Sequence, residues 1–139
     1  MKRCESLLQL SREHHGALVL AKRIERCPPD HAARLALCSE VSARFVAELA
    51  PHFDEEEQRV LPLMREAFPE AVQRTLDDHR ILRTLIVRIA EQDDSALAEF
   101  AQRLAQHVRF EERELFPLYE SLLPAPDGGA AALSMRIIS

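Results

Sequence analysis

Residues 52–62 read HFDEEEQRVLP, and residues 107–117 read HVRFEERELFP. At an offset of 55 residues, the two stretches share His at the first position, Glu at the fifth and sixth positions and Pro at the eleventh. A single His followed four residues later by Glu means little in a chain rich in Glu, but two copies with four shared positions indicate an internal repeat. Because residues four apart lie on one face of an α-helix, each stretch can direct one His and one Glu toward a common centre.

The sequence around this repeat predicts four long helices separated by Pro and polar clusters. We expect these helices over about 6–26, 30–67, 70–91 and, after a turn at 92–95, to about 122. Short connections favour antiparallel neighbours. The predicted fold is therefore all-α, an antiparallel up-down-up-down four-helix bundle over residues 1–124 with a C-terminal tail over 125–139.

Apolar residues recur at helical spacing in each segment, which predicts core-facing stripes. His and Glu lie inside these stripes, an unusual place for them. The predicted stripe of the second helix contains Val41, Phe45, His52, Glu56 and Leu63. Pro51 and Pro62 in the second helix and Pro117 in the fourth each remove a backbone donor, so we expect kinks there but no breaks.

A weaker repeat surrounds two further histidines, because Glu13-His14 and Asp78-His79 each open an apolar helical stretch. The chain thus resembles two related helix hairpins, each with one His and then one His-x-x-x-Glu. His14 and His15 compete for the first role. The positions three, seven and ten residues after His14 are apolar, whereas those after His15 are mostly polar, which favours His14 and keeps His15 as the alternative.

These residues predict a metal site inside the bundle. Burying carboxylates without a cation costs several kcal/mol each, and a pair of divalent ions bridged by the carboxylates removes that cost. Imidazole nitrogen and carboxylate oxygen suit Fe, Mn or Zn and argue against a thiolate site. We expect two iron ions, with Zn or Mn as less favoured metals. The candidate ligands are His14, His52, Glu56, His79, His107 and Glu111.

With this arrangement of residues, the chain resembles a hemerythrin-like (HHE cation-binding) domain over about residues 6–122. The resemblance implies a non-haem di-iron centre that binds or reacts with dioxygen, nitric oxide or peroxide, in sensing, iron handling or stress response. Oxygen-carrying members are expected to have a further His where this chain has Thr75, and a bridging Asp where it has Glu112. One ligand fewer leaves one iron more open and disfavours reversible oxygen carriage.

Three other interpretations account for some of the same residues. A ferritin-like di-iron oxidase or peroxidase should use Glu-x-x-His spacing and more carboxylates than histidines, neither of which is found here. A mononuclear zinc module and a metal-free helical interaction module are further alternatives. No motif marks an organic substrate pocket, so the sequence favours a binding protein over an enzyme without deciding between them.

Acidic residues beside the candidate ligands are most simply exposed charges. For Glu57, Glu112 and Asp78, a hydrogen bond to a ligand His is the alternative. His31 is expected to lie in a solvated connection.

Composition excludes some classes of function. The net charge is −5, and Lys and Arg do not form a separate basic segment, so the sequence does not indicate nucleic-acid binding. The chain opens without a signal sequence or membrane span, so we expect a cytoplasmic protein with no membrane partner. Cys4, Cys27 and Cys38 are odd in number and lack Cys-x-x-Cys spacing, which predicts reduced thiols.

Overall fold

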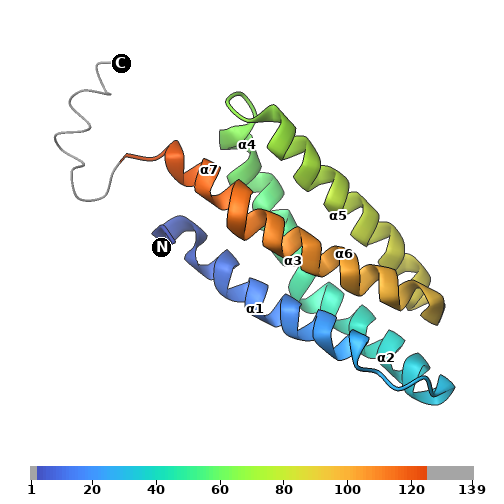
Figure 1. Cartoon of the computed structure of the whole chain (residues 1–139). Helices are drawn as coiled ribbons and strands as arrows, with labels where there is room; N and C mark the ends of the chain where they lie inside the picture. The colour runs from blue at the N-terminus through green and yellow to red at the C-terminus, as the bar shows by residue number, and fades with distance from the viewer. Residues whose placement is uncertain (1–2, 125–139) are drawn as a thin grey trace.

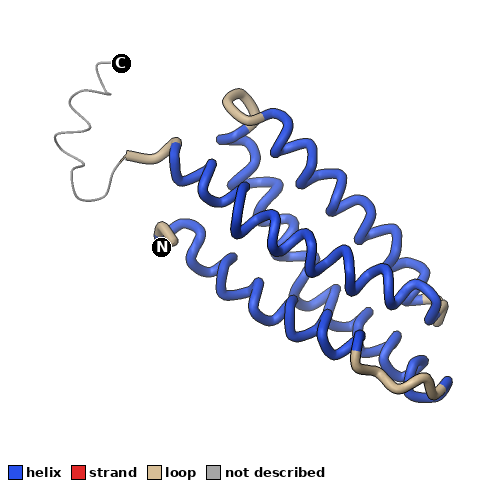
Figure 2. Tube along the Cα trace, viewed as in Figure 1, coloured by secondary structure: helices blue, strands red, loops and turns tan. Residues whose placement is uncertain are grey.

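The computed structural model describes residues 3–124, and the predicted tail at 125–139 lies outside this range. The described chain forms four long helical segments without strands, and they lie side by side (Figure 1, Figure 2). The first segment is α1 (Glu5–Glu25). The second consists of α2 (His31–Arg44), η1 (Phe45–Leu49), α3 (Ala50–Glu55), η2 (Glu56–Val60) and α4 (Leu61–Met64). The third is α5 (Pro69–Ala90), and the fourth consists of η3 (Asp94–Ala96), α6 (Leu97–Phe110), η4 (Glu111–Leu115) and α7 (Phe116–Ser121).

The all-α prediction is confirmed, and the helix limits agree with the expected ones to within a few residues. Asp30 caps α2 by accepting a hydrogen bond from the Ala33 backbone N–H at 2.8 Å. Asp93 accepts one from the Ser95 backbone N–H at 3.1 Å, so the predicted turn does cap the fourth segment. The second segment ends at Met64, three residues before the expected end at Ala67, because residues 65–67 form a turn.

The three prolines inside the helices do not break them. Each follows a π-helical turn that begins six residues earlier: η1 before Pro51, η2 before Pro62 and η4 before Pro117. Proline donates no backbone hydrogen bond, and in each π-turn the residue before proline donates instead to the carbonyl five residues back: Ala50 to Phe45, Leu61 to Glu56 and Phe116 to Glu111. Glu56 and Glu111 are the first residues of η2 and η4, so the repeat places both in the same local geometry.

The π-turns correct one detail of the predicted stripe. Leu63 was expected on the core face of the second segment but is 60% exposed. Each π-turn adds a residue to its helical turn, and both η1 and η2 lie between Val41 and Leu63. A count of about 3.6 residues per turn therefore no longer predicts the buried face correctly at Leu63. Leu61 and Met64 are buried instead.

The core has two apolar parts. One is built mainly on α1, α2, α5 and α6 around Phe100. The other lies around Phe116 and combines the N-terminal parts of α1 and α5 with residues of η2, α4, η4 and α7. The buried polar residues fall between the two parts along each helix. This layer contains His14, His52, Glu56, Thr75, His79, His107 and Glu111.

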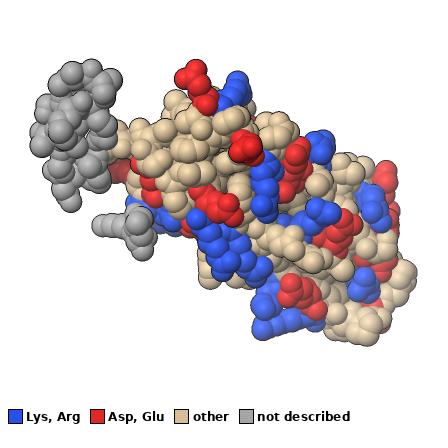
Figure 3. Space-filling model, turned by 45° about the horizontal axis from the view of Figure 1, so that its top comes forward, with Lys and Arg blue, Asp and Glu red and all other residues tan. Residues whose placement is uncertain are grey.

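The outside of the molecule carries charges of both signs. Figure 3 shows Lys and Arg interspersed with Asp and Glu over the visible face. None of the helices within residues 3–124 combines the length and the apolar character that crossing a membrane would require. All three cysteines are free, with Cys38 buried and Cys4 and Cys27 half-buried.

Candidate metal centre

The six residues expected to bind metal meet in the polar layer of the core. His14 comes from α1, His52 from α3, His79 from α5 and His107 from α6, and the two glutamates come from the π-turns. All six are buried, with exposed fractions of 4% or less. His15, the alternative to His14, is exposed on the other side of α1. His31 is exposed as expected, although it is the first residue of α2 and not part of a loop.

Their ligand atoms form two adjacent groups. Each group offers four ligand atoms that all lie within 4.8 Å of one another, and Glu56 and Glu111 belong to both. In the first group, His52 Nε2 lies 3.1 Å from Glu56 Oε2, and His14 Nε2 lies 2.7 Å from Glu111 Oε1. In the second, His79 Nε2 lies 3.0 Å from Glu56 Oε1, and His107 Nε2 lies 3.1 Å from Glu111 Oε2. Each glutamate thus turns one oxygen to each group.

A ring of outer carboxylates holds the four imidazoles. The Nδ1 atom of every histidine in the layer lies within hydrogen-bond distance of an acidic side chain. The pairs are His14 with Glu112 at 2.6 Å, His52 with Glu13 at 2.7 Å, His79 with Glu57 at 2.6 Å and His107 with Asp78 at 2.9 Å. Because an ionised carboxylate only accepts hydrogen bonds, each Nδ1 donates. This fixes the ring orientation and turns Nε2 toward the centre.

The outer carboxylates are themselves held in place. Arg83 donates to Glu57 at 2.8 Å, and the Ser11 hydroxyl donates to Glu112 at 2.6 Å. Arg3 also lies beside Glu112, with Nε 3.5 Å from Oε1. Since the hydrogen bond to His79 and the one to Arg83 both favour the ionised form, they outweigh burial and lower the pKa of Glu57. The pKa of Glu112 is lowered too, because its hydrogen bonds to His14 and Ser11 outweigh burial, so Glu57 and Glu112 are fixed anions.

Several buried polar atoms of the centre have no hydrogen-bond partner in the surrounding protein. Among the described residues, Glu56 Oε2, Glu111 Oε2 and His107 Nε2 are buried without a hydrogen-bond partner. Two of these atoms, His107 Nε2 and Glu111 Oε2, lie only 3.1 Å apart without the alignment of a hydrogen bond. Orphaned buried donors and acceptors are rare in proteins. Nitrogen and oxygen atoms that face one another in this way fit a cation, so the clusters are able to hold metal ions.

The electrostatics of the layer also call for positive charge. Burial alone would lower the pKa of His52, but the facing, negatively charged carboxylates of Glu111 and Glu56 raise it to about 11. In the same way, the charge of Glu111 and the hydrogen bond to Asp78 outweigh burial and raise the pKa of His107 to about 10. Burial would raise the pKa of Glu111, yet the charge of His107 holds it well below its usual range. Without metal, protons on the imidazoles must balance the glutamates.

Aromatic rings close the layer on both sides. The Phe53 ring stacks on His79 with centroids 4.0 Å apart, and the Phe116 ring stacks on His14 at 5.2 Å. Both phenylalanines are buried. They limit rotation of the imidazoles and keep bulk water away from the ligand atoms, as expected for residues that wall a metal pocket.

The two positions that depart from the oxygen-carrying pattern have clear places in the structure. Thr75 is fully buried, and its hydroxyl donates to the Ala71 carbonyl at 2.9 Å, so it offers no nitrogen ligand. Glu112 does not face the centre, because its Oε2 is held by His14 and Ser11. Glu111, one residue earlier, takes the inward position.

One residue of the ring was missed by the sequence reading. Glu57, Glu112 and Asp78 were considered as hydrogen-bond partners of ligand histidines, whereas Glu13 was not. The signal was present: Glu13 precedes His14 as Asp78 precedes His79. In both hairpins this acidic residue reaches the histidine of the following helical segment, His52 or His107.

Comparison with known proteins agrees with this geometry. A family model described as "Hemerythrin HHE cation binding domain" matches residues 7–119. Searches of curated proteins and of solved structures found no match to the chain. The matched region contains all six buried residues of the centre and all four outer carboxylates. The chain therefore belongs to the hemerythrin HHE cation-binding domain family.

Proposed function

We propose that this protein binds a pair of iron ions in the polar layer of its helical bundle. His14 and His52 would hold one ion, His79 and His107 would hold the other, and Glu56 and Glu111 would contribute to both sites. The observation that carries the proposal is the convergence of four Nε2 atoms and four carboxylate oxygens in two adjacent groups that share both glutamates. The short connections between segments favour the antiparallel up-down-up-down order that this arrangement assumes.

The type of ligand atom and the number of sites favour iron. Imidazole and carboxylate ligands suit Fe, Mn and Zn, and two carboxylate-bridged sites suit an ion pair better than a single structural zinc. Bound iron would supply reversible electron transfer to dioxygen, nitric oxide or peroxide. The chain's own part is to fix the imidazoles through Nδ1 and to shield the layer with Phe53 and Phe116.

The role that fits best is binding or sensing of a small oxidant, iron handling or stress response. Each group has four protein ligands, which leaves positions open on both ions. Thr75 contributes no further imidazole. A centre with open positions favours reaction with an oxidant over reversible oxygen carriage, and the cell compartment in which it acts is proposed to be the cytoplasm.

Anaerobic loading with Fe(II) tests this function directly. We expect about two iron ions per chain, because two groups of four ligands are present. Exposure to air should then produce visible charge-transfer bands, since the ferrous pair is oxidised. Metal analysis and absorption spectroscopy provide the measurement. Fewer than one bound ion per chain would contradict the proposal, and two tightly bound zinc ions that exclude iron would favour a zinc protein.

The outer carboxylates provide a second prediction. Glu13→Ala removes the partner of His52 Nδ1 without touching a ligand atom, so metal affinity should fall by about 10–100-fold. Competition with a chromophoric chelator measures this change. Glu5→Ala is the matched control, because Glu5 lies exposed on the same helix and its loss changes the net charge equally. Equal affinities for the two variants would show that Glu13 does not orient the ligand.

A further inference from the structure

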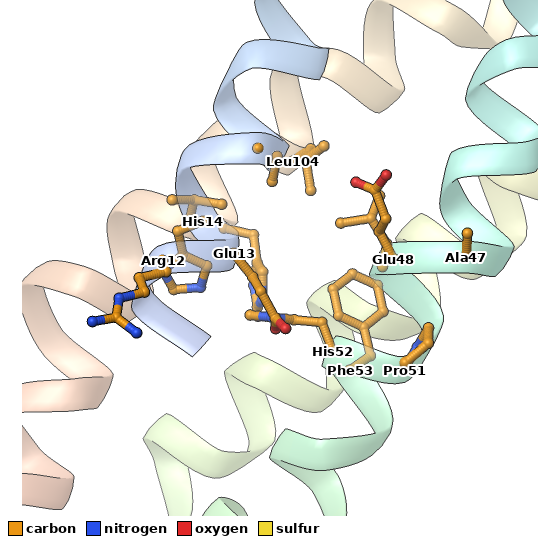
Figure 4. Close-up of a pocket in the computed structure, with 14 residues that line it drawn as sticks. Arg12, Glu13, His14, Ala47, Glu48, Pro51, His52, Phe53 and Leu104 are labelled. Atoms are coloured by element: carbon orange, nitrogen blue, oxygen red, sulfur yellow. The ribbon is translucent and has the colours of Figure 1, made fainter. Parts of the chain in front are cut away.

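A cavity leads from the surface to one side of the polar layer. Its volume is about 320 Å³, and it lies between α1 and the η1–α3 part of the second segment, with α6 as its floor (Figure 4). Its inner end is formed by His14, His52 and His107. The walls are mainly apolar and include Ala17, Leu49, Phe53, Leu104 and Val108. No sequence motif predicts this cavity.

The second helix hairpin, formed by the third and fourth segments from α5 to α7, has large side chains at the positions that correspond to this cavity. With His14 aligned to His79, Gly16 corresponds to Ile81 and Ala17 corresponds to Leu82. Leu82 is fully buried in the core, and Ile81 packs against it. The α1 helix therefore carries the two smallest residues at the place where α5 carries two large ones. The cavity follows from this difference.

The other wall differs between the hairpins as well. At the offset of 55 residues, Pro51 corresponds to Gln106, and η1 corresponds to an uninterrupted stretch of α6. Ala47, Glu48 and Leu49 of this additional π-turn line the cavity. π-Turns inside helices are often found at functional sites. The first hairpin thus departs from the repeat on both sides of the same space.

Gly16 is not required by packing. A Cβ atom added there would meet only Arg44 Nη2, at 3.9 Å, which is ordinary van der Waals contact. Glycine in the interior of a helix is less favourable than alanine because it loses more backbone entropy on folding. A glycine that costs stability and has room for a side chain calls for another reason. The open space beside it provides one.

We propose that this cavity binds a small, neutral organic molecule with an apolar body and one oxygen-bearing end, the class that includes alkyl hydroperoxides and their alcohols. Gly16 keeps the mouth open for it. This inference rests on the proposed function, because the oxygen-bearing end of the ligand is inferred from a centre that reacts with small oxidants. The cavity volume of about 320 Å³ is about ten times the volume that one water molecule occupies in the liquid. It is larger than a diatomic gas needs and falls within the usual range of ligand-pocket volumes.

The charges at the mouth support a neutral ligand. Glu13 and Glu48 line the cavity, and Glu48 is paired with Arg44 at 3.1 Å. Figure 4 shows the Arg12 guanidinium turned away from the cavity, whereas the Glu13 carboxylate lies beside His52. A carboxylate or phosphate would meet acidic side chains and apolar walls, so anionic ligands are disfavoured. The oxygen-bearing end would lie next to His52 at the inner end.

Binding of 2-phenyl-2-propanol to the full chain as purified tests the inference. Saturation-transfer NMR should detect the probe, and Gly16→Ile, which copies the second hairpin, should weaken its binding at least about tenfold because the side chain fills the mouth. Gly16→Ala should bind the probe like the original chain. Val19→Phe is a further control, because Val19 lines a separate groove between α1 and α2. Unchanged binding in Gly16→Ile, or loss of binding in Val19→Phe, would overturn the proposal.

Two further measurements separate this inference from the proposed function. Metal content is determined for each variant, and it should not change in Gly16→Ile, because residue 16 offers no ligand. If the chain takes up no iron on anaerobic Fe(II) loading but still binds the probe in a way that Gly16→Ile weakens, the cavity is supported and the di-iron function is contradicted. Thermal unfolding should show Gly16→Ile at least as stable as the original chain, since isoleucine is a better helix former than glycine. A large loss of stability would instead show that position 16 is a packing residue.

Discussion

Replacing Glu111 with Gln is expected to reduce bound metal from about two ions per chain to less than one. Glu111 offers Oε1 to the group that contains His14 and Oε2 to the group that contains His107. Its neutralisation therefore weakens both sites at once. Removing one member of a buried charged pair costs about 3–5 kcal/mol, which corresponds to a loss of affinity of at least about a hundredfold. Metal analysis after Fe(II) loading and desalting measures the outcome.

The control for this variant lies in the same π-turn. Glu114→Gln makes the same change of charge and shape three residues later, at an exposed position of η4. It should retain both ions. If Glu111→Gln and Glu114→Gln bind the same amount of metal, Glu111 does not bridge the ions. If Glu111→Gln loses a single ion only, the two sites depend on Glu111 unequally, which would contradict the symmetric arrangement proposed above.

The repeat carried most of the predictive information in the sequence. Two His-x-x-x-Glu stretches on apolar stripes predicted the burial of His52, Glu56, His107 and Glu111, and all four are buried. The facing argument also predicted that His14, and not its neighbour His15, faces the core, and His14 is buried whereas His15 is exposed. Helical periodicity succeeds wherever a residue's position depends on its own helix alone.

Contacts between helices were harder to predict. Nothing in the spacing of α1 says that Glu13 reaches His52 on another segment, since that contact depends on how the helices are rotated against each other. The exposure of Leu63 depends on two π-turns, and proline alone does not reveal how its helix adapts. The cavity beside Gly16 arises from a difference between two hairpins that otherwise repeat, and it becomes visible only when both are placed in space.

Removal of metal is expected to lower the midpoint of thermal unfolding by roughly 10–20 °C. Two ions that bind only the folded chain, each at a concentration about thirtyfold above its Kd, together stabilise it by about 4 kcal/mol. For a domain of this size each kcal/mol shifts the midpoint by about 3–5 °C. Differential scanning calorimetry of the iron-loaded protein, with and without a strong chelator, measures the shift. Adding back Fe(II) anaerobically should restore the original midpoint.

The same experiment on Glu111→Gln links stability to the centre itself. A chelator should leave the midpoint of this variant almost unchanged, because little metal remains to be removed. A chelator could also act through weak ions bound to exposed carboxylates, and Glu114→Gln accounts for that effect, since it should respond like the original chain. The metal-free protein should still fold, because protonated His52 and His107, with pKa values raised to about 11 and about 10, balance the buried glutamates. An equal shift in Glu111→Gln and Glu114→Gln would place the stabilising metal outside the polar layer.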